Sequence, residues 1–283
     1  MLIFALGIVV AGLVVAFIPS REASYAGKRL SEWVDGYATR SSSGESDEAI
    51  RHIGTNAIPY LLKWIQYETP GWKSVLSERL HRIPVGRRLA WEPHEREFRA
   101  SWAVLAFRAL GSEAKQAFPE LCRLMNNPDR GGPAARATAA LGFLGKDALQ
   151  PLMRALTNKD ARIRVSAVSA VSFLNTNARP AVPLLIQSLN DPDLFVAVRA
   201  TMVLGELKLE PDLAISALTN SLQDPRGSVR VYAARALGRF GNEARQALPA
   251  LANHLADSDR SMRNAVTNAI REIDPGALAR AAR

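Results

Sequence analysis

The chain has 283 residues, of which 48% are hydrophobic and 22% charged, a balance that excludes a disordered, low-complexity polypeptide. It carries 36 Lys and Arg against 27 Asp and Glu, a formal net charge of +9, but acidic residues are interspersed throughout and the excess is spread thinly. The single cysteine, Cys122, excludes an internal disulfide framework and any site that needs two thiolates.

Residues 1–18, "MLIFALGIVVAGLVVAFI", form an uninterrupted apolar run that is long enough to cross a bilayer as a helix. We expect residues 1–19 to be a retained membrane anchor. A cleaved secretory signal is the alternative, and it would leave the rest of the chain secreted or periplasmic. Basic residues follow the run at Arg21, Lys28 and Arg29, which favours the cytoplasm for the C-terminal part.

Residues 20–45 are expected to be a juxtamembrane segment and a linker. A short helical piece is centred on Leu30, Trp33, Val34 and Tyr37, and a Ser-rich stretch follows it. We place the boundary of the folded region in that stretch, ahead of a repeat array over 46–283.

The array is predicted from a recurring sequence. The context of Gly238 in "AARALGRFG" returns at intervals of 30 to 33 residues, at Gly111, Gly142, Ser172, Gly205 and Arg271, with a shortened copy at Gly54. A period of this size is typical of a solenoid, in which each helix pair buries its apolar faces against its neighbours. We therefore expect about six to seven helix pairs.

Each repeat carries its own boundary signals. A carboxylate that can accept hydrogen bonds from unpaired N–H groups begins the first helix at Asp160, Asp193 and Asp259. A glycine tolerant of positive φ is expected to end it, at Gly111, Gly142, Gly205 and Gly238. The second helix is entered near a proline: Pro119, Pro151, Pro183 and Pro249.

The stretches "VRVYAARALG", "DARIRVSAVSAV" and "DRSMRNAVTNAI" resemble the short HEAT-like repeats of bilin lyases and of many bacterial proteins. The whole chain also resembles small membrane-anchored bacterial HEAT-repeat proteins. The resemblance implies a right-handed α-solenoid that acts as a scaffold. It also implies an Asp and Arg ladder between adjacent units, with Asp160 and Arg164, and Asp259 and Arg263, as its members. The ladder is incomplete, because one repeat has its arginine at Arg199 instead and another has Ala103 in that column.

In HEAT-like arrays the second helices line the concave surface. Aligned on their leucines, they present a column of exposed polar residues, basic in its first half and amide in its second: Lys63, Arg123, Arg154, Gln187, Asn220 and Asn253. We hypothesise that Lys63, Arg123 and Arg154, with Trp64 beside them, bind the acidic surface of another protein. The alternative is that these long side chains only solvate an inner face.

A second candidate surface is an insertion at about 68–97. Its apolar positions are surrounded by basic residues, and its candidate contacts are Trp72, Arg82, Arg87 and Arg88. Such a stretch can lie on anionic lipid headgroups or bind a partner. It can also simply extend the core of one elongated repeat.

No catalytic, cofactor-binding or metal-binding motif is recognised in the sequence. We therefore expect a non-catalytic scaffold or adaptor held at a membrane, without a cofactor. Nucleic-acid binding is an alternative, but it requires basic residues sustained over several repeats, and Gln187, Asn220 and Asn253 interrupt them. A bilin lyase or isomerase is the remaining alternative, and it rests on the repeat resemblance alone.

Overall fold

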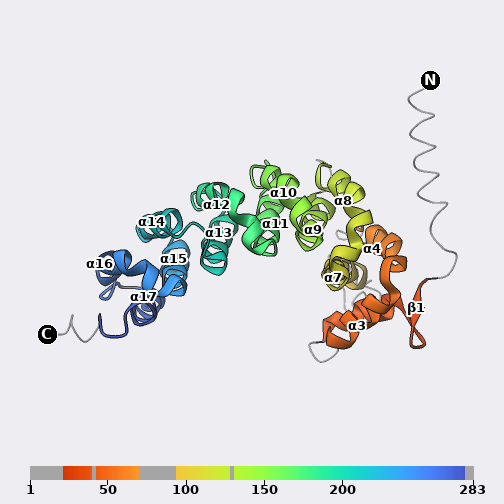
Figure 1. Ribbon diagram of the computed structural model, residues 1–283, viewed down its shortest axis with the longest axis horizontal. Helices are drawn as coiled ribbons and strands as arrows, with labels where there is room; N and C mark the ends of the chain where they lie inside the picture. Colours follow the sequence, from red (N-terminus) through yellow and green to blue (C-terminus); the bar gives the residue numbers. More distant parts are fainter. Residues whose placement is uncertain (1–21, 40–42, 70–93, 128–130, 278–283) are drawn as a thin grey trace, which may run out of the picture. The chain divides into compact units, whose positions relative to one another are not determined.

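The computed structural model describes residues 22–39, 43–69, 94–127 and 131–277, and the chain divides into two compact units, Met1–Leu144 and Gly145–Arg283. The described residues of both units are helical apart from one two-stranded hairpin (Figure 1), which confirms the predicted all-α repeat architecture. Within this part of the chain, no helix has the length and apolar character needed to span a bilayer. The apolar run over 1–18, for which we expect an anchor, lies outside the described residues.

Unit 1 consists of the hairpin followed by helices and short 3₁₀ turns. In chain order these are β1 (Ser24–Tyr25), β2 (Lys28–Arg29), α2 (Leu30–Asp35), η1 (Gly36–Ala38), α3 (Ser43–Ile53), η3 (Gly54–Ala57), α4 (Ile58–Ile65), α7 (His94–Leu110), η4 (Gly111–Ala117), α8 (Phe118–Met125), α9 (Gly131–Leu141) and η5 (Gly142–Leu144). Helix α7 is central, because it packs against α2, α3, α4 and α9.

The folded part of unit 1 includes residues ahead of position 46. Leu30, Trp33 and Val34 of α2 are buried, and α2 packs against both α3 and α7. The Nε1 of Trp33 donates a hydrogen bond to the carbonyl of Tyr25 at 3.0 Å, and the buried hydroxyl of Ser46 donates to the carbonyl of Trp33 at 2.7 Å. Helix α2 is therefore part of the core of unit 1, and the exposed hairpin is attached to it through the hydrogen bond from Trp33 to Tyr25.

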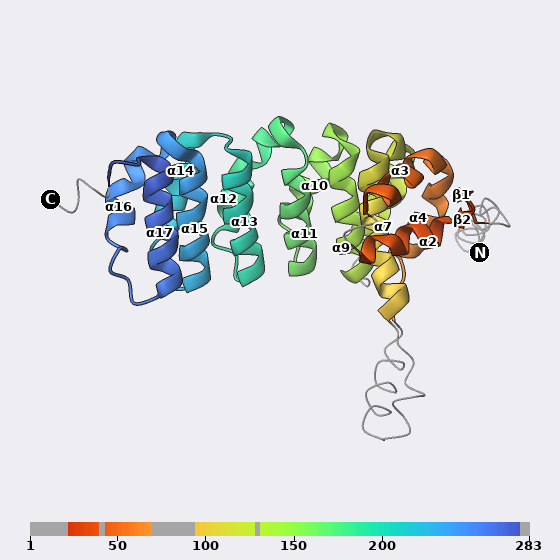
Figure 2. The same cartoon turned by 90° about the horizontal axis from the view of Figure 1, so that it is seen from below.

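Unit 2 repeats a helix pair. Its elements are η6 (Lys146–Ala148), α10 (Leu149–Ala155), α11 (Ala161–Ser172), η7 (Asn175–Ala181), α12 (Val182–Ser188), α13 (Leu194–Leu207), α14 (Pro211–Ser221), α15 (Gly227–Phe240), η8 (Gly241–Ala247), α16 (Leu248–Ala252) and α17 (Arg260–Ile273). The first helices α11, α13, α15 and α17 lie side by side (Figure 2), and each packs against the second helix that precedes it, which is α10, α12, α14 and α16 in turn.

Two of the predicted boundary signals are confirmed: the Asp residues that begin the first helices and the prolines near the start of the second helices. Asp160, Asp193 and Asp259 are the N-cap residues of α11, α13 and α17, and each carboxylate accepts a hydrogen bond from a backbone N–H two residues ahead. The side chain of Arg162 also donates to Asp160 and holds the pKa of that carboxyl below its ordinary value. Prolines stand in the first turn of α8, α12 and α16, as predicted.

The predicted role of the glycines is wrong at three of the four positions, and two of these three glycines lie inside helices. Gly205 and Gly238 lie inside α13 and α15, and the residues with positive φ come three positions later, at Lys208 (φ 53°) and Gly241 (φ 59°). A Cβ on Gly205 would lie 2.9 Å from the Cα of Ala236 in the next first helix. The missing side chain thus allows neighbouring first helices to approach closely.

Two further glycines complete this comparison. Gly111 has the expected positive φ of 53°, whereas Gly142 does not, and Gly145 adopts a φ of 87° instead. The chain therefore reverses direction after the short 3₁₀ turn rather than at Gly142.

The Asp and Arg ladder of unit 2 has different members from those expected. Arg164 does not pair with the carboxylate of Asp160. Its Nε and Nη2 each donate to Asp191 at 2.7 Å, in the turn that follows the next second helix, and its Nη1 donates to the carbonyl of Asn158 at 2.8 Å. Arg263 likewise donates to the carbonyl of Asp257, at 2.6 Å. These arginines close the turns between helix pairs because the carbonyls there have no helical partner.

Candidate functional site

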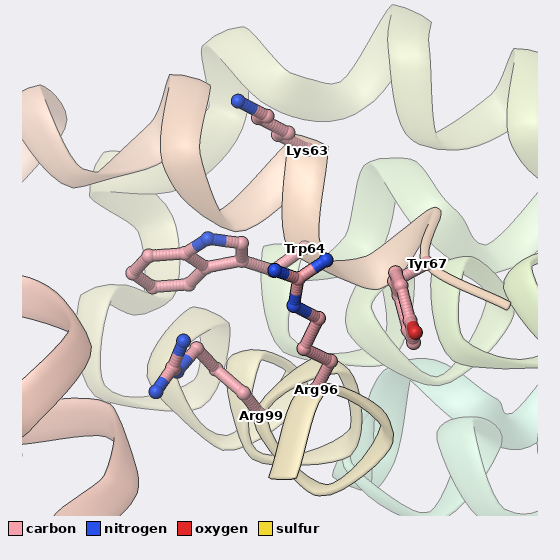
Figure 3. A pocket seen from close by; sticks show the side chains of 5 residues that line it. All are labelled: Lys63, Trp64, Tyr67, Arg96 and Arg99. Atoms are coloured by element: carbon pink, nitrogen blue, oxygen red, sulfur yellow. The ribbon is translucent and has the colours of Figure 1, made fainter. Parts of the chain in front are cut away.

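A recess of about 330 Å³ in unit 1 is lined by three basic and two aromatic side chains, which are Lys63, Trp64, Tyr67, Arg96 and Arg99 (Figure 3). The second helix α4 and the turn after it supply the first three, and the first helix α7 supplies the two arginines. Both pairs, Trp64 with Tyr67 and Arg96 with Arg99, are three residues apart. That spacing places Arg96 and Arg99 on one face of α7.

Arg99 is fixed in position by a carboxylate. Its Nε donates to the Oδ1 of Asp35 at 2.8 Å and its Nη2 donates to the other carboxylate oxygen. The hydrogen bond to Asp35 raises the pKa of Arg99 above its ordinary value. The guanidinium carbon lies 5.8 Å from the ring centroid of Trp64, so the Asp35 and Arg99 pair also places a cation against the indole.

Lys63 and Arg96, unlike Arg99, are not held by a carboxylate of the described residues. Both side chains are exposed, and neither forms an ion pair with any residue in the described part of the chain. The guanidinium carbon of Arg96 lies 5.9 Å from the ring centroid of Tyr67. The recess therefore offers two cations that have no ion pair within the described residues, next to two aromatic rings, an arrangement that attracts an anionic group.

The backbone beneath Tyr67 is held by α9. The Nε of Arg136 donates to the carbonyl of Ile65 at 2.9 Å, and its Nη2 donates to the carbonyl of Tyr67. These carbonyls lie at the end of α4 and have no helical partner. Burial lowers the pKa of Arg136, which indicates that the guanidinium is partly removed from water to make these bonds. Tyr67 is thus carried by a fixed turn.

The structure brings together only part of the predicted column. Lys63 and Trp64 line the recess, but Arg123 on α8 does not. Arg123 is exposed and pairs with Glu120 one turn earlier, with Nε to Oε2 at 2.7 Å and Nη2 to Oε1 at 2.6 Å. Its charge is therefore already balanced by its own helix.

The members of the column in unit 2, Arg154, Gln187, Asn220 and Asn253, are all exposed. Asn220 lines a hollow of about 360 Å³ beside α12 and α14, together with Gln223 and Asp224. An adjoining hollow of about 380 Å³ shares Gln223 and Asp224 and adds His254. Arg154, Gln187 and Asn253 line neither hollow.

The other predicted surface is only partly visible. Trp72, Arg82, Arg87 and Arg88 of the insertion lie outside the described residues. Helix α7 begins at His94, so the end of the predicted 68–97 segment belongs to a first helix. Within the described ranges, no cluster of His, Cys, Asp and Glu side chains could hold a metal ion.

Tyr67, Arg96 and Arg99 are absent from the sequence-based prediction. Alignment of the second helices cannot find them, because Tyr67 lies in a turn and both arginines lie on a first helix. The sequence did contain a signal for these residues. Two aromatic residues lie three positions apart at the end of α4, and two arginines lie three positions apart at the start of α7.

Helix pairs that recur through both units define the chain as an α-helical repeat protein. Residues 215–282 match the family of HEAT repeats. No curated protein matches the chain.

Several solved structures are similar to the chain. The complex of CpcE and CpcF of phycocyanin lyase from Nostoc sp. PCC7120 is 25% identical, with 55% of this chain and 98% of that chain covered and a TM-score of 0.46. A designed armadillo repeat protein in complex with the peptide (KR)4 is 18% identical, with 70% and 99% covered and a TM-score of 0.45. A computationally designed armadillo repeat protein for modular peptide recognition is 17% identical, with 87% and 100% covered and a TM-score of 0.47. These scores mark a partial likeness.

Proposed function

We propose that this protein is a non-catalytic scaffold that binds another protein through an acidic surface of that partner. The observation that carries the proposal is the recess of unit 1, where Lys63 and Arg96 lie beside Trp64 and Tyr67 without an ion pair to any residue that the structure describes. Aromatic and arginine side chains in a partly desolvated recess are the residue types that dominate protein interfaces. Opposite charge on the partner would steer association and fix its orientation.

The cellular setting is part of the same proposal. Residues 1–19 anchor a right-handed α-solenoid at a membrane, with the repeats on the cytoplasmic side, as the basic residues after the apolar run favour. Cleavage of this segment, with release to the periplasm or the outside, is the alternative. Protease treatment of sealed vesicles distinguishes the two sides, because repeats in the cytoplasm are protected only in right-side-out vesicles.

Nucleic-acid binding is the second candidate, because Arg96 with Trp64 and Tyr67 resembles the cationic and aromatic surfaces on which bases stack. A nucleic acid also requires cations for successive phosphates. Arg99 and Arg123 are already paired with carboxylates, and after Arg154 the column in unit 2 continues with amides. This reduces the cations available to a strand and favours a protein partner.

A crosslinking pull-down from native membranes tests the proposal. The full-length chain is compared with a K63E/R96E variant and with a K146E/R245E variant, which reverses two exposed charges of unit 2 and so matches the change in net charge. We expect one protein to be captured by the first and third forms and lost with the second. Equal capture by all three forms moves the site away from the recess, and capture by none contradicts the scaffold.

The remaining predicted residues are tested in the same way. An R123E/R154E variant should retain the partner, because Arg123 is balanced by Glu120 and Arg154 lines neither hollow of unit 2. Loss of the partner with this variant would instead support the longer basic column that the sequence predicts.

A further inference from the structure

We propose that the recess accepts a segment of the partner in which an aromatic residue lies next to carboxylates, with the aromatic ring against Trp64 and a carboxylate between Lys63 and Arg96. The inference rests on the proposed function, since it names the chemistry of the partner segment at the same site.

The aromatic half of the site is held in place before a ligand arrives. Trp64 packs against Tyr60 with ring centroids 6.3 Å apart, and the guanidinium of Arg99 lies 5.8 Å from its ring. Arg99 is in turn held by Asp35. Trp64 nevertheless remains partly exposed and lines the recess, so its indole is a fixed ring that a second ring can contact without loss of side-chain freedom.

The part of the recess that would bind the carboxylate of the ligand is identified from its cations. Arg99 is neutralised by Asp35, whereas Lys63 and Arg96 have no carboxylate partner in the described part of the chain. Figure 3 shows the Lys63 side chain extending from α4 above Trp64 and the guanidinium of Arg96, which comes from α7, beside the base of the Trp64 side chain. A ligand carboxylate next to the bound ring would be placed between two charges of opposite sign to its own.

The size of the recess limits the occupant. About 330 Å³ is at the lower end of the volumes that hold small ligands. It accommodates one ring and the group beside it, but not the apolar face of a whole helix. A short extended segment therefore fits the recess better than a folded surface does.

The balance of charge favours a peptide over a nucleic acid. A strand brings one phosphate per nucleotide and gains affinity only where cations continue along it. Of the three cations in the described lining, Lys63 and Arg96 have no ion pair to a described residue, and the exposed Arg123, also in unit 1, is paired with Glu120. One or two carboxylates match this supply of charge.

The inference is tested by measuring the binding of short peptides to the full-length chain in mild detergent. Fluorescence anisotropy of the labelled peptide reports the binding. The probe is a labelled, capped pentapeptide with tyrosine between two pairs of glutamates. Its controls replace the tyrosine by alanine or all glutamates by glutamine. We expect the probe to bind and each control peptide to bind at least about tenfold more weakly, as loss of one ring contact or of the ion pairs predicts.

Variants assign the contacts. Trp64→Ala should remove the preference for tyrosine over alanine while charge dependence remains, and Trp64→Phe, which keeps a ring, should restore most of it. K63E/R96E should weaken the probe at least about tenfold, whereas K146E/R245E stays within about twofold of the parent. Circular dichroism of every variant shows that it is folded.

The outcomes separate this inference from the proposed function. Equal binding of the tyrosine and alanine peptides, or probe binding that survives K63E/R96E, overturns the inference. So does a labelled single-stranded oligonucleotide that binds the recess more tightly than the peptide. If the pull-down from native membranes still loses its partner with K63E/R96E, the scaffold stands although the peptide chemistry is wrong; if the peptide binds and no partner is captured, the scaffold is contradicted.

Discussion

Arg226 donates a hydrogen bond from its Nη1 to the backbone carbonyl of Asp191 at 2.6 Å, so the side chain that begins one helix pair closes the turn of the preceding pair. Elsewhere in unit 2 this closure is made by an arginine of the first helix that follows the turn, such as Arg230 on the carbonyl of Asp224 at 2.9 Å. The position equivalent to Arg230 in the preceding repeat is Ala197. Arg226 therefore supplies, from the next repeat, a donor that Ala197 cannot.

Replacement of Arg226 by alanine tests whether Arg226 stabilises the turn at Asp191. The carbonyls of Asp191 and Leu189 would both lose a donor, at 2.6 and 3.1 Å, and partly buried acceptors left without one cost about 1–3 kcal/mol. Chemical denaturation should show a fall of that size in the free energy of unfolding. Arg162→Ala is the matched control, since 66% of the Arg162 side chain is exposed and its pair with Asp160 should contribute less than about 1 kcal/mol.

The same turn is held from the other side by Arg164. Its bidentate pair with Asp191 leaves only 13% and 9% of the two side chains exposed. Arg164→Ala leaves the carboxylate without its partner, and we expect a loss of about 3 kcal/mol in the free energy of unfolding. A double replacement of Arg164 and Asp191 should lose less than the sum of the single replacements, which a double-mutant cycle measures. Additive losses would contradict a direct interaction.

The contribution of this pair depends on pH. Burial alone would raise the pKa of Asp191, but hydrogen bonds from Arg164 and from the N–H of Asp193 outweigh burial and hold the pKa below its ordinary value. A carboxyl with a lowered pKa in the folded state stabilises the fold above its unfolded pKa of about 3.9 and ceases to do so as the pH falls through the folded value. The stability difference between the parent and Arg164→Ala should thus be full at neutral pH and shrink below about pH 4. A difference that stays constant down to acid pH would contradict this account.

Salt should weaken the proposed peptide contact. Lys63 and Arg96 are exposed, so their attraction for a ligand carboxylate is screened as the Debye length falls from about 10 Å at 0.1 M to about 3 Å at 1 M salt. Anisotropy titrations over this range should give a falling affinity for the parent and no such fall for K63E/R96E, because its reversed charges repel the glutamates of the probe and salt screens that repulsion. A salt-independent affinity would indicate that the ring contact alone accounts for binding.

The sequence allowed one part of the site to be predicted and concealed another. Lys63 and Trp64 were found because second helices can be aligned on their leucines. Arg96 and Arg99 belong to the next first helix, and only folding brings them beside α4. The pairing of Arg123 was accessible from sequence, because Glu120 stands three residues before it on the same helix.

For the fold, signals that act within a few residues were predictable. The Asp N-caps and the prolines of the second helices depend on local hydrogen bonding and on a fixed φ, and both occur where they were expected. The ladder was not predictable in detail, because Arg164 can reach either Asp160 in its own repeat or Asp191 in the next. Tertiary geometry selects Asp191.

Glycine in the last turns of the first helices illustrates the same limit and gives a final prediction. Glycine near a helix end either adopts positive φ or makes room for a neighbour, and Gly205 does the second, with Ala236 against it. Separation of the backbones of α13 and α15 in Gly205→Ala should cost about 1–3 kcal/mol, and the gain in helix propensity offsets about 1 kcal/mol of it. We therefore expect a net destabilisation of unit 2 of up to about 2 kcal/mol. Gly227→Ala is the control, since its Cβ would meet only the flexible end of Arg230 at 3.7 Å, and it should be neutral or stabilising. Denaturation that shows equal effects for the two substitutions would contradict close packing of the first helices at Gly205.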